Sequence, residues 1–418
     1  MSKYLIEIGK NAKKAFKKNF LSNNKRKNAV LNQFNNILKK EIKNILAQNK
    51  KDLDYARKIK LNTNIIDRLF LNKERIDQIR DSINKITKFK DPIGKIISTW
   101  RRPNGLVIKK ITIPIGIIGV IFESRPNVSS DVASLCFKSG NTVILRGGSE
   151  CINSNKILVD LFRYCLKQKQ FDVNAVQLIQ NQNRKLVDFF LSKMNNYLNV
   201  IIPRGGKTLV KKVQDKSRVP IIGHLEGICH IYIDKDADLG MAIKVIKNAK
   251  MRKTSNCNSL ETLLIDKKIV KKFSYPILNE LYNSGCKIIA DNIIKKQFKK
   301  TFRLANEKDW LTEYLAPIIS VKSVNGVDGA IQHINKYGTM HTDSIITKNI
   351  KIANKFLHNV KSSIALHNAS TQFADGGEFG FGAEVGISTN NLPPRGPVGI
   401  EQLTSYKYLI YGKGQIRK

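Results

Sequence analysis

Residues 113–150 read IPIGIIGVIFESRPNVSSDVASLCFKSGNTVILRGGSE, and this stretch decides the fold class. It contains IIGVIF, a continuous run of apolar, mostly β-branched residues, which is typical of a strand buried on both faces. A helical pattern follows at 129–139, and NTVILR is a second apolar strand. Strand, helix and strand in succession predict parallel strands in a layered α/β sheet.

The same alternation continues toward the C-terminus. We expect strands at AVQLI, NVII and CHIYID, with helices near 150–168 and 183–195. A second set has strands at ETLLI, KIIA, PIISV, SIIT and SSIAL, with helices near 268–283 and 327–337. A chain of 418 residues suits two or three domains of about 150 residues each. The pattern predicts two α/β domains with parallel sheets, joined near residue 235.

The segments outside these sets have other patterns. The first ninety residues have apolar residues at helical spacing. This pattern predicts helices that pack against the rest of the protein and contribute no catalytic residues. Residues 96–113 predict a β-hairpin, because Asn104-Gly105 accepts the positive φ of a two-residue turn. TSYKYLIYG, near the C-terminus, predicts another strand. The helical stripes include Leu5, Ile8, Ala12 and Phe16; Leu31, Phe34, Leu38, Ile42 and Ile45; and Ile76, Ile79, Ile83 and Ile86.

The charge is unusual, since 73 Lys and Arg against 33 Asp and Glu give a net charge of +40. One interpretation is a nucleic-acid-binding protein. The other is an enzyme with a uniformly basic surface. The lysines occur in nearly every segment and collect in no single arm or helix, which favours the enzyme. We expect no specific nucleic-acid partner, only weak and salt-sensitive association.

The six cysteines include no C-x-x-C pair, and their sparse spacing indicates reduced thiols. The amino terminus has no apolar core long enough for a signal peptide. The longest apolar run, Ile113–Phe122, is broken by Pro and Gly and falls short of the roughly 20 residues of a membrane span. We expect a cytoplasmic protein with no membrane partner.

Two glycine pairs are candidates for a phosphate-binding loop, although the G-x-G-x-x-G motif is absent. Gly147-Gly148 follows NTVILR, and Gly205-Gly206 follows NVIIPR. The carboxyl ends of parallel strands are where α/β sheets bind ligands. Ordinary turn glycines are the alternative for each pair taken alone.

Cys257 lies in TSNCNSLET, among small and polar residues that suit a core poorly. Arg252 and Lys253 are close in sequence, and nearby cations favour a thiolate nucleophile. The histidines form no HExxH motif and no dense ligand cluster, so the sequence predicts no metal site and leaves a Cys–His pair open.

With these motifs the chain resembles the gamma-glutamyl phosphate reductase family, also called glutamate-5-semialdehyde dehydrogenases, in the aldehyde dehydrogenase superfamily. The resemblance covers essentially the whole chain. Besides residues 113–150 it rests on HLEGICHIYID, CNSLETLLI, GTMHTDSI, NASTQFADGGEFGFGAEVGIST and RGPVGIEQLTSYKYLIYGKGQIR, in the family's order.

The resemblance implies a domain plan. Residues 1–235 would form a cofactor-binding domain with a hairpin protruding near 96–113, and residues 236–365 a catalytic domain with the cysteine. Residues 366–418 would return to the cofactor domain and end in an oligomerisation strand. We therefore expect a homo-oligomer built on a small β element.

The implied reaction is NADPH-dependent reduction of L-glutamyl 5-phosphate to L-glutamate 5-semialdehyde, with release of phosphate, as the second step of proline synthesis from glutamate. Glutamate 5-kinase is a candidate partner. A hydrolytic aldehyde dehydrogenase is the rival enzyme, but it lacks ESRPN and DGGEFGFGAEVG.

The resemblance also assigns site residues. Cys257 would be the nucleophile, and the Asn127 amide with the Cys257 backbone N–H would bind the oxyanion. Glu226 is either a support for proton handling or cofactor placement, or a structural residue. Cofactor binding is expected at Arg146, Gly147, Gly148, Ser149, Gly205, Gly206 and Glu313, and substrate binding at Arg125, Arg252 and Asn368.

The chain departs from the family at one point. The family usually reads Gln-Arg-Pro shortly before the cysteine, whereas this chain reads Met251-Arg252-Lys253. Proline restricts the backbone, so its loss predicts a more mobile cysteine loop.

Overall fold

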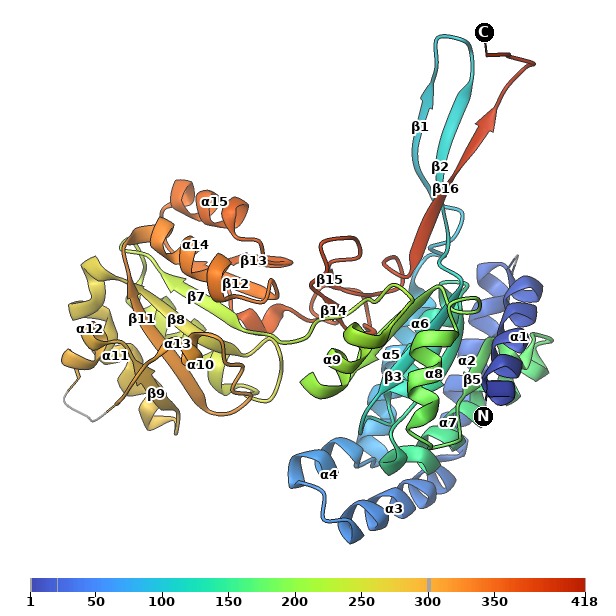
Figure 1. Cartoon of the computed structure of the whole chain (residues 1–418), viewed down its shortest axis with the longest axis horizontal. Coiled ribbons are helices and arrows are strands. Elements are labelled where there is room, and N and C mark those ends of the chain that lie inside the picture. The colour runs from blue at the N-terminus through green and yellow to red at the C-terminus, as the bar shows by residue number, and fades with distance from the viewer. Residues whose placement is uncertain (1, 21, 299–301, 418) are drawn as a thin grey trace. The chain divides into compact units, whose positions relative to one another are not determined.

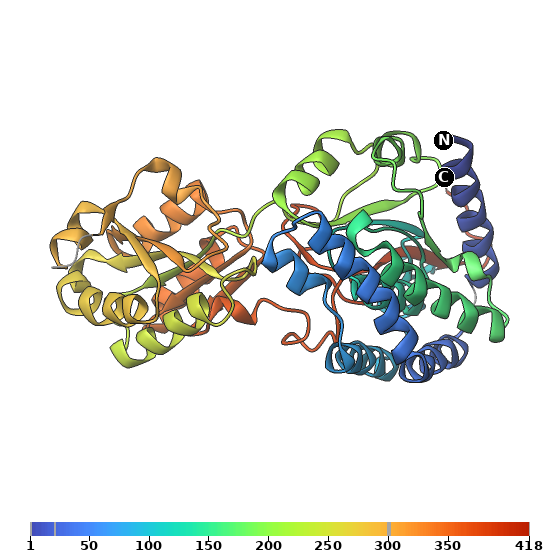
Figure 2. The same cartoon turned by 90° about the horizontal axis from the view of Figure 1, so that it is seen from below.

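The structure, a computed structural model, describes residues 2–20, 22–298 and 302–417. Two compact units make up the chain. The first contains Met1–Gly223, Gly380–Gly386 and Val398–Lys418, and the second contains His224–Phe379 and Ile387–Pro397. Each unit has helices on both sides of a parallel sheet, as the strand–helix alternation predicts (Figure 1, Figure 2).

The first unit combines helices from the amino-terminal half with two sheets. Its helices are α1 (Ser2–Asn19), α2 (Asn24–Lys40), α3 (Ile42–Lys58), α4 (Thr63–Leu69), α5 (Lys73–Lys88), α6 (Val128–Lys138), η1 (Ser149–Cys151), α7 (Ile152–Gln168), η2 (Val173–Ala175), α8 (Lys185–Lys193) and α9 (Lys207–Lys216). Its strands are β1 (Ile96–Arg101), β2 (Val107–Pro114), β3 (Ile117–Phe122), β4 (Thr142–Arg146), β5 (Val176–Leu178), β6 (Val200–Arg204) and β16 (Thr404–Tyr411).

The central sheet of this unit is parallel, with the order β5-β4-β3-β6. Every residue of β3 is buried, because successive side chains enter two different cores. Ile118, Val120 and Phe122 pack with residues of α2, α5, α6 and α7, and Ile117 and Ile121 pack with α1 and α8. Burial of each such side chain contributes roughly 1.5–3 kcal/mol, which explains why an uninterrupted apolar run marks this strand.

The predicted hairpin forms, and the carboxyl-terminal strand joins it. β1, β2 and β16 make a three-stranded antiparallel sheet in which Trp100 faces Ile108 and Tyr408 faces Lys110. The turn differs from the expected two-residue type, since Gly105 N donates to Arg102 O at 2.9 Å and only Gly105 has a positive φ, of 86°. The loop is thus a three-residue connection with glycine in the left-handed position.

The second unit has a single large sheet and a short β-hairpin. Its helices are α10 (Leu239–Met251), η3 (Lys267–Ile269), α11 (Val270–Asn283), α12 (Asn292–Lys296), α13 (Glu307–Trp310), α14 (Gly326–Tyr337), α15 (Ile350–Asn359) and η4 (Thr371–Phe373). Its strands are β7 (Cys229–Ile233), β8 (Leu260–Asp266), β9 (Lys287–Ala290), β10 (Arg303–Leu304), β11 (Ile318–Val324), β12 (Thr342–Ile346), β13 (Ile364–His367), β14 (Ile387–Ser388) and β15 (Gly396–Pro397).

The large sheet is parallel, with the order β10-β9-β11-β8-β7-β12-β13. One core lies under α10 and α11, and another lies under α14 and α15. The adjacent strands β8, β7 and β12 are therefore covered on both faces.

The boundary between the units differs from the expected one. The sequence pattern places the join near residue 235, whereas the compact units separate after Gly223. β7 belongs to the second unit, because it pairs with β8 and β12. The return also differs from the predicted segment 366–418, since within it only Gly380–Gly386 and Val398–Lys418 belong to the first unit.

A second difference concerns the amino-terminal helices. The apolar stripe from Leu31 to Ile45 looks continuous, but the helix breaks at Glu41, whose ψ of 12° departs from helical geometry. The apolar stripe still predicts the buried face of the helix on each side of the break, because Leu31 and Ile45 are fully buried.

Candidate active site

Three loops that follow neighbouring strands gather at one edge of the first unit's sheet. Residues 123–127 follow β3, residues 147–149 follow β4, and residues 205–206 follow β6. β3 lies between β4 and β6, and all three strands are parallel, so their carboxyl ends share an edge. The structure thus brings together predicted residues that are up to about eighty positions apart in sequence.

Asn127 lies at the start of α6 and is half-buried. Its Nδ2 donates to Asp131 Oδ2 at 3.0 Å. Asp131 Oδ1 is buried without a hydrogen-bond partner among the described residues. Burial raises the pKa of Asp131 to about 6, although the Asn127 hydrogen bond and the Arg204 charge oppose this shift. Asp131 therefore sets the direction in which the Asn127 amide points.

Gly147 and Gly148 are required by close packing. A Cβ atom at Gly147 would lie 2.1 Å from Asn155 Nδ2, and one at Gly148 would lie 2.1 Å from Glu150 Oε1. The Glu150 carboxylate is fixed there, because Oε1 accepts from Ser124 N at 2.7 Å and from Ser124 Oγ at 2.8 Å. Neither glycine has a positive φ, so both act through the space they leave and not as turn glycines.

The Arg146 guanidinium is held by backbone carbonyls. Nη1 donates to Gly147 O at 2.8 Å and Nη2 donates to Gln182 O at 3.3 Å. Nε is buried and has no partner among the residues that the structure describes. Burial lowers the pKa of Arg146, while the Glu150 carboxylate raises it. The side chain is a fixed cation whose buried Nε–H remains unused, since arginine stays charged in proteins.

The second glycine pair starts a helix. Gly206 is the N-cap of α9, and its N–H donates to Glu123 Oε2 at 3.0 Å. A Cβ atom at Gly205 would lie 2.4 Å from the same oxygen. Helix amino termini attract anions. The Glu123 carboxylate is the anion at this terminus in the structure.

Cys257 is the only one of the six cysteines that is not buried, and all six lie in described residues. It lies in the second unit, in the loop between α10 and β8. Asn258 Nδ2 donates to the backbone oxygen of Gln372 at 3.3 Å. Gln372 Nε2 in turn lies 3.1 Å from Ala249 O and 3.3 Å from Lys253 O. Gln372 therefore restrains the loop at the point where the family usually has proline.

The segment with Glu226 packs against the cysteine loop. A Cβ atom at Gly227 would lie 2.0 Å from Cys257 O, so only glycine permits this approach. Gly227 N donates to Glu313 Oε1 at 2.9 Å. Glu226 and Glu313 are both half-buried. The structure thus brings the two predicted glutamates to the segment beside Cys257.

The three predicted substrate-binding residues have different surroundings. Arg252 is exposed, and its Nη1 lies 3.4 Å from Gln372 Oε1. Arg125 is half-buried in the first unit. Asn368 forms two hydrogen bonds with one residue, since Oδ1 accepts from Thr347 N and Nδ2 donates to Thr347 O, each at 3.0 Å. These bonds fix the orientation of the amide, and the expected substrate contact of Asn368 stays a prediction.

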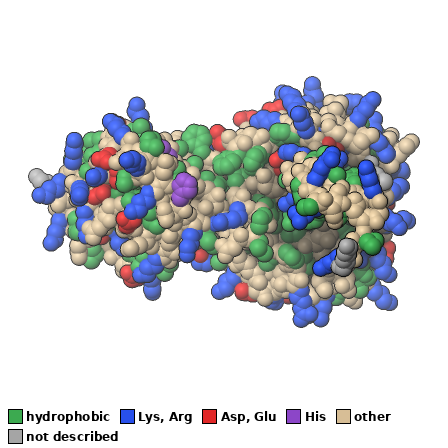
Figure 3. All heavy atoms as spheres, turned by 90° about the horizontal axis from the view of Figure 1, so that it is seen from above, with side chains coloured by type: hydrophobic (Ala, Val, Ile, Leu, Met, Phe, Trp, Pro, Cys, Tyr) green, Lys and Arg blue, Asp and Glu red, His purple; other side chains and the backbone are tan. Residues whose placement is uncertain are grey.

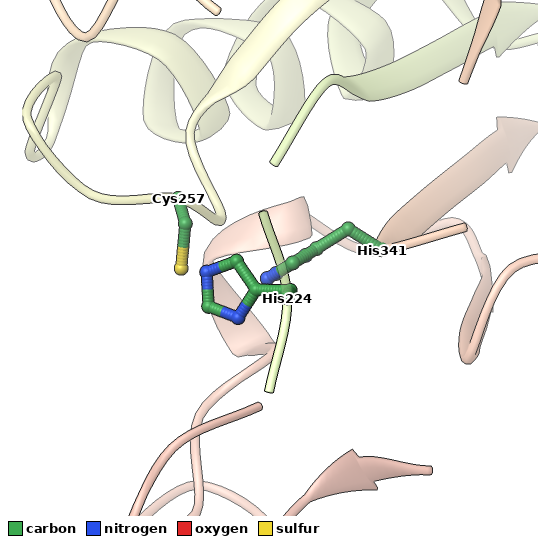
Figure 4. A group of neighbouring side chains, drawn as sticks. All are labelled: His224, Cys257 and His341. Atoms are coloured by element: carbon green, nitrogen blue, oxygen red, sulfur yellow. The ribbon is translucent and has the colours of Figure 1, made fainter. Parts of the chain in front are cut away.

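Two histidines to which the sequence assigns no role, His224 and His341, lie near Cys257. The ligating atoms of His224, Cys257 and His341 all lie within 4.8 Å of one another, and Figure 4 shows the three side chains pointing toward a common region. The prediction of no dense ligand cluster is therefore wrong for these three residues. Each precedes a strand, but only the sheet order shows that the strands are neighbours.

A buried ion pair lies behind the cysteine loop. Lys250 Nζ and Glu261 Oε2 are 2.8 Å apart, and neither side chain is exposed. Glu261 Oε1 also accepts from Leu315 N at 3.2 Å. Burial raises the pKa of Glu261 to about 7, although the Lys250 charge opposes the shift. The pair joins the end of α10 to β8, on either side of Cys257.

The positive charge is scattered. Figure 3 shows Lys and Arg side chains spread over the visible face of both units, interspersed with acidic and apolar groups. On this face the basic residues form no single patch of the kind that binds nucleic acid. Within residues 2–20, 22–298 and 302–417, every helix is too short or too polar to span a lipid bilayer.

Known proteins resemble this chain along its whole length. A family model described as "Aldehyde dehydrogenase family" matches residues 4–284. Gamma-glutamyl phosphate reductase of Mesorhizobium japonicum is 45% identical over 413 residues, which cover 99% of this chain and 96% of that protein. The protein of the same name from Brucella suis is 44% identical over 417 residues, covering 100% and 99%.

The crystal structure of gamma-glutamyl phosphate reductase from Thermotoga maritima superposes with a TM-score of 0.96 at 40% identity, covering 99% of this chain and 100% of that one. The chain therefore belongs to the aldehyde dehydrogenase family and, within it, to the gamma-glutamyl phosphate reductases.

Proposed function

We propose that this protein reduces L-glutamyl 5-phosphate to L-glutamate 5-semialdehyde with NADPH and releases phosphate, as the second step of proline synthesis from glutamate. The observation that carries the proposal is the full-length identity to gamma-glutamyl phosphate reductases. Cys257 is half-buried whereas the other five cysteines are buried, which supports its role as nucleophile.

The first step follows from the chemistry of the acyl phosphate. The Cys257 thiolate attacks the acyl carbon, a C–S bond forms, and the C–O bond to phosphate breaks. Phosphate leaves with the bonding electron pair, and the chain holds a thioester at Cys257. The thiol proton has gone to solvent before attack. Phosphate is a good leaving group, which favours its displacement by the thiolate.

The tetrahedral intermediate requires donors for its oxyanion. We assign them to the Cys257 backbone N–H and the Asn127 side-chain amide, by resemblance to the superfamily. One such donor typically contributes about 3 kcal/mol to catalysis. The bond from Asn127 to Asp131 supports this assignment, because it holds the amide in one orientation.

The first unit fits a nicotinamide cofactor. Arg146 has a buried Nε–H without a partner among the described residues, and it lies at the carboxyl end of β4, where the Gly147-Gly148 loop begins. The Gly205-Gly206 loop follows β6 at the same edge of the sheet, which is where parallel α/β sheets bind ligands. We propose that Arg146, Gly147, Gly148, Ser149, Gly205 and Gly206 hold the cofactor, with Glu313 contacting its ribose. When bound, the cofactor supplies the hydride that converts the thioester to the aldehyde. Arg146 would favour a 2′-phosphate, which arginine binds with charge-assisted hydrogen bonds.

Other residues receive supporting roles. Glu226 matches the position where hydrolytic relatives activate water, and water attack would waste the thioester here. We assign it proton handling or cofactor placement, with a structural role as the alternative. Arg125 and Arg252 are the proposed contacts for the substrate's anionic groups, since guanidinium groups match carboxylates and phosphates.

The oligomeric state and the cellular location are also proposed from the resemblance. The β1-β2-β16 sheet exposes Trp100, Tyr408 and Ile410, which suits an oligomerisation element. We propose a cytoplasmic homo-oligomer, with glutamate 5-kinase as the enzyme that supplies the unstable acyl phosphate.

The test runs the reaction in reverse. NADP⁺ reduction by glutamate semialdehyde should require phosphate, because phosphate must attack the thioester. A phosphate-independent rate would indicate the hydrolytic aldehyde dehydrogenase instead. The absence of any rate, combined with tight and salt-sensitive DNA binding, would overturn both.

A further inference from the structure

We propose that Cys257, His224 and His341 form a binding site for one thiophilic divalent cation of the zinc class. Occupation of this site would reversibly inhibit the enzyme by coordinating its nucleophile. The binding rests on the geometry of the second unit alone, and the inhibition rests on the proposed function.

The three side chains meet because of the sheet topology. His224 precedes β7, Cys257 precedes β8, and His341 precedes β12. In the sheet, β7 lies between β8 and β12, and all three strands are parallel. Their amino ends therefore share one edge, and residues just before the strands become neighbours.

The separations suit a single ion. All three ligating atoms lie within 4.8 Å of one another. Tetrahedral zinc with bonds of about 2.0–2.3 Å places its ligands about 3.3–3.6 Å apart, so no pair has to close by more than about 1.5 Å. His224 and Cys257 are only half-buried, and small side-chain rotations can supply this movement. Two imidazoles and one thiolate leave the fourth position open for water.

The protein fixes the tautomer of His224. Its Nδ1 lies 2.8 Å from the backbone oxygen of Ile387. A carbonyl oxygen only accepts, so Nδ1 carries the proton and the lone pair of the neutral ring is on Nε2. Zinc-binding histidines commonly donate their other N–H to a carbonyl in this way.

Hydrogen bonds also fix the tautomer of His341. Its Nδ1 lies 2.9 Å from Thr342 Oγ1 and 3.6 Å from Cys229 Sγ, and Cys229 Sγ donates to Cys257 O at 3.2 Å. Because the Cys229 thiol uses its hydrogen on Cys257, its sulfur accepts from His341 Nδ1. The Nε2 atom of His341 is buried without a partner among the described residues. An unpartnered lone pair in a fully buried ring is costly, and a cation would satisfy it.

The local charge also suits a cation, despite the net charge of +40. Cys229 is buried, and the carboxylates of Asp343 and Glu313 lie close enough to act on it electrostatically. Exposed basic residues, among them Arg252 and Lys253 of the same loop, are screened by salt over about 10 Å. On binding, the metal gains bonds to one sulfur and two nitrogens, and the thiol proton is released to solvent.

Cobalt provides the direct test, because Co²⁺ takes zinc's geometry and a cobalt–thiolate bond has a charge-transfer absorption. The full-length protein should bind one Co²⁺ per chain with this band. Cys257→Ser should lose the band, and His224→Gln and His341→Gln should each weaken binding at least about tenfold. His358→Gln, at an exposed histidine of the same unit, should bind as the wild type does.

Alkylation tests the site without any substitution. The other five cysteines are buried, so iodoacetamide should modify Cys257 first. Zn²⁺ should protect Cys257, as measured by peptide mass, and should inhibit the reductase until a chelator is added. Absence of the cobalt–thiolate band, equal binding by wild type and His224→Gln, or no protection by Zn²⁺ would overturn the site. A protein that has no reductase activity but still shows the cobalt–thiolate band and the protection by Zn²⁺ would instead overturn the proposed function.

Discussion

The two sheets of this protein present their candidate residues in opposite ways. In the first unit, loops after β3, β4 and β6 offer mainly backbone, glycine space and one fixed arginine. In the second unit, residues before β7, β8 and β12 offer a thiol and two imidazoles. A ligand site built from backbone groups is recognisable in the sequence as contiguous glycines. A site built from reactive side chains is assembled from segments that are distant in the sequence.

The largest effect is expected at the second sheet. Cys257→Ser should lower reduction at least about a thousandfold, because an alkoxide is far harder to form near neutral pH than a thiolate. Its melting temperature should stay close to that of the wild type. Cys286→Ala, at a buried cysteine of the same unit, should keep its activity. More than a few per cent of activity in the serine variant would remove Cys257 from the mechanism.

The next prediction concerns the support of the cysteine loop. Lys250→Met should lower the free energy of unfolding by about 3–5 kcal/mol, since it leaves the Glu261 carboxylate buried without its partner. Urea titration measures this loss. Lys250→Met combined with Glu261→Leu should recover most of it. Lys247→Met, in the exposed pair with Glu280, should cost only about 0–1 kcal/mol.

Asp131 should produce a pH dependence that belongs to the first sheet. Its pKa of about 6 in the folded chain lies above the ordinary value of 3.8, so the folded state binds the proton more tightly. Its contribution to stability is present below about pH 4 and is lost as the pH rises through 6, by about 1–3 kcal/mol. Unfolding titrations from pH 4 to 8 should show a smaller decline in Asp131→Asn. Parallel curves would show that the group is not desolvated.

Asn127 tests whether the first sheet also contributes to chemistry. Asn127→Ala should lower the turnover number about a hundredfold, with a smaller effect on cofactor affinity. Asp131→Asn should lose less, because an amide oxygen still accepts the Asn127 N–H. An unchanged turnover number with a raised Michaelis constant would assign Asn127 to substrate binding.

The smallest effect is expected at Arg146. Arg146→Ala should weaken NADPH binding about ten- to hundredfold, because a charge-assisted contact to the 2′-phosphate is lost, and should affect NADH less. Arg184→Ala removes an exposed arginine whose charge acts on Arg146, and it should leave the preference nearly unchanged. Fluorescence titration of both cofactors checks this. Equal losses for NADH and NADPH would mean that Arg146 does not recognise the 2′-phosphate.

Much of the fold could be predicted, and the errors have identifiable causes. The run IIGVIF coincides with β3, because a strand buried on both faces needs apolar residues at every position. The expected boundary near 235 lies one strand beyond the division after Gly223, since β7 has the same local pattern as the strands of the first sheet. Asn368 matches a family segment, and the tertiary structure adds that its amide bonds to Thr347.

The sequence by itself determined the alternating α/β layers, the polar setting of Cys257 and the position of both glycine pairs. These properties depend on local periodicity and on contiguous residues. Only the tertiary structure decided that His224 and His341 lie beside Cys257, and that Gln372 restrains the loop where proline is missing. The physical reason is that the order of parallel strands sets which loops share an edge, and strand order depends on long-range pairing that no local pattern encodes.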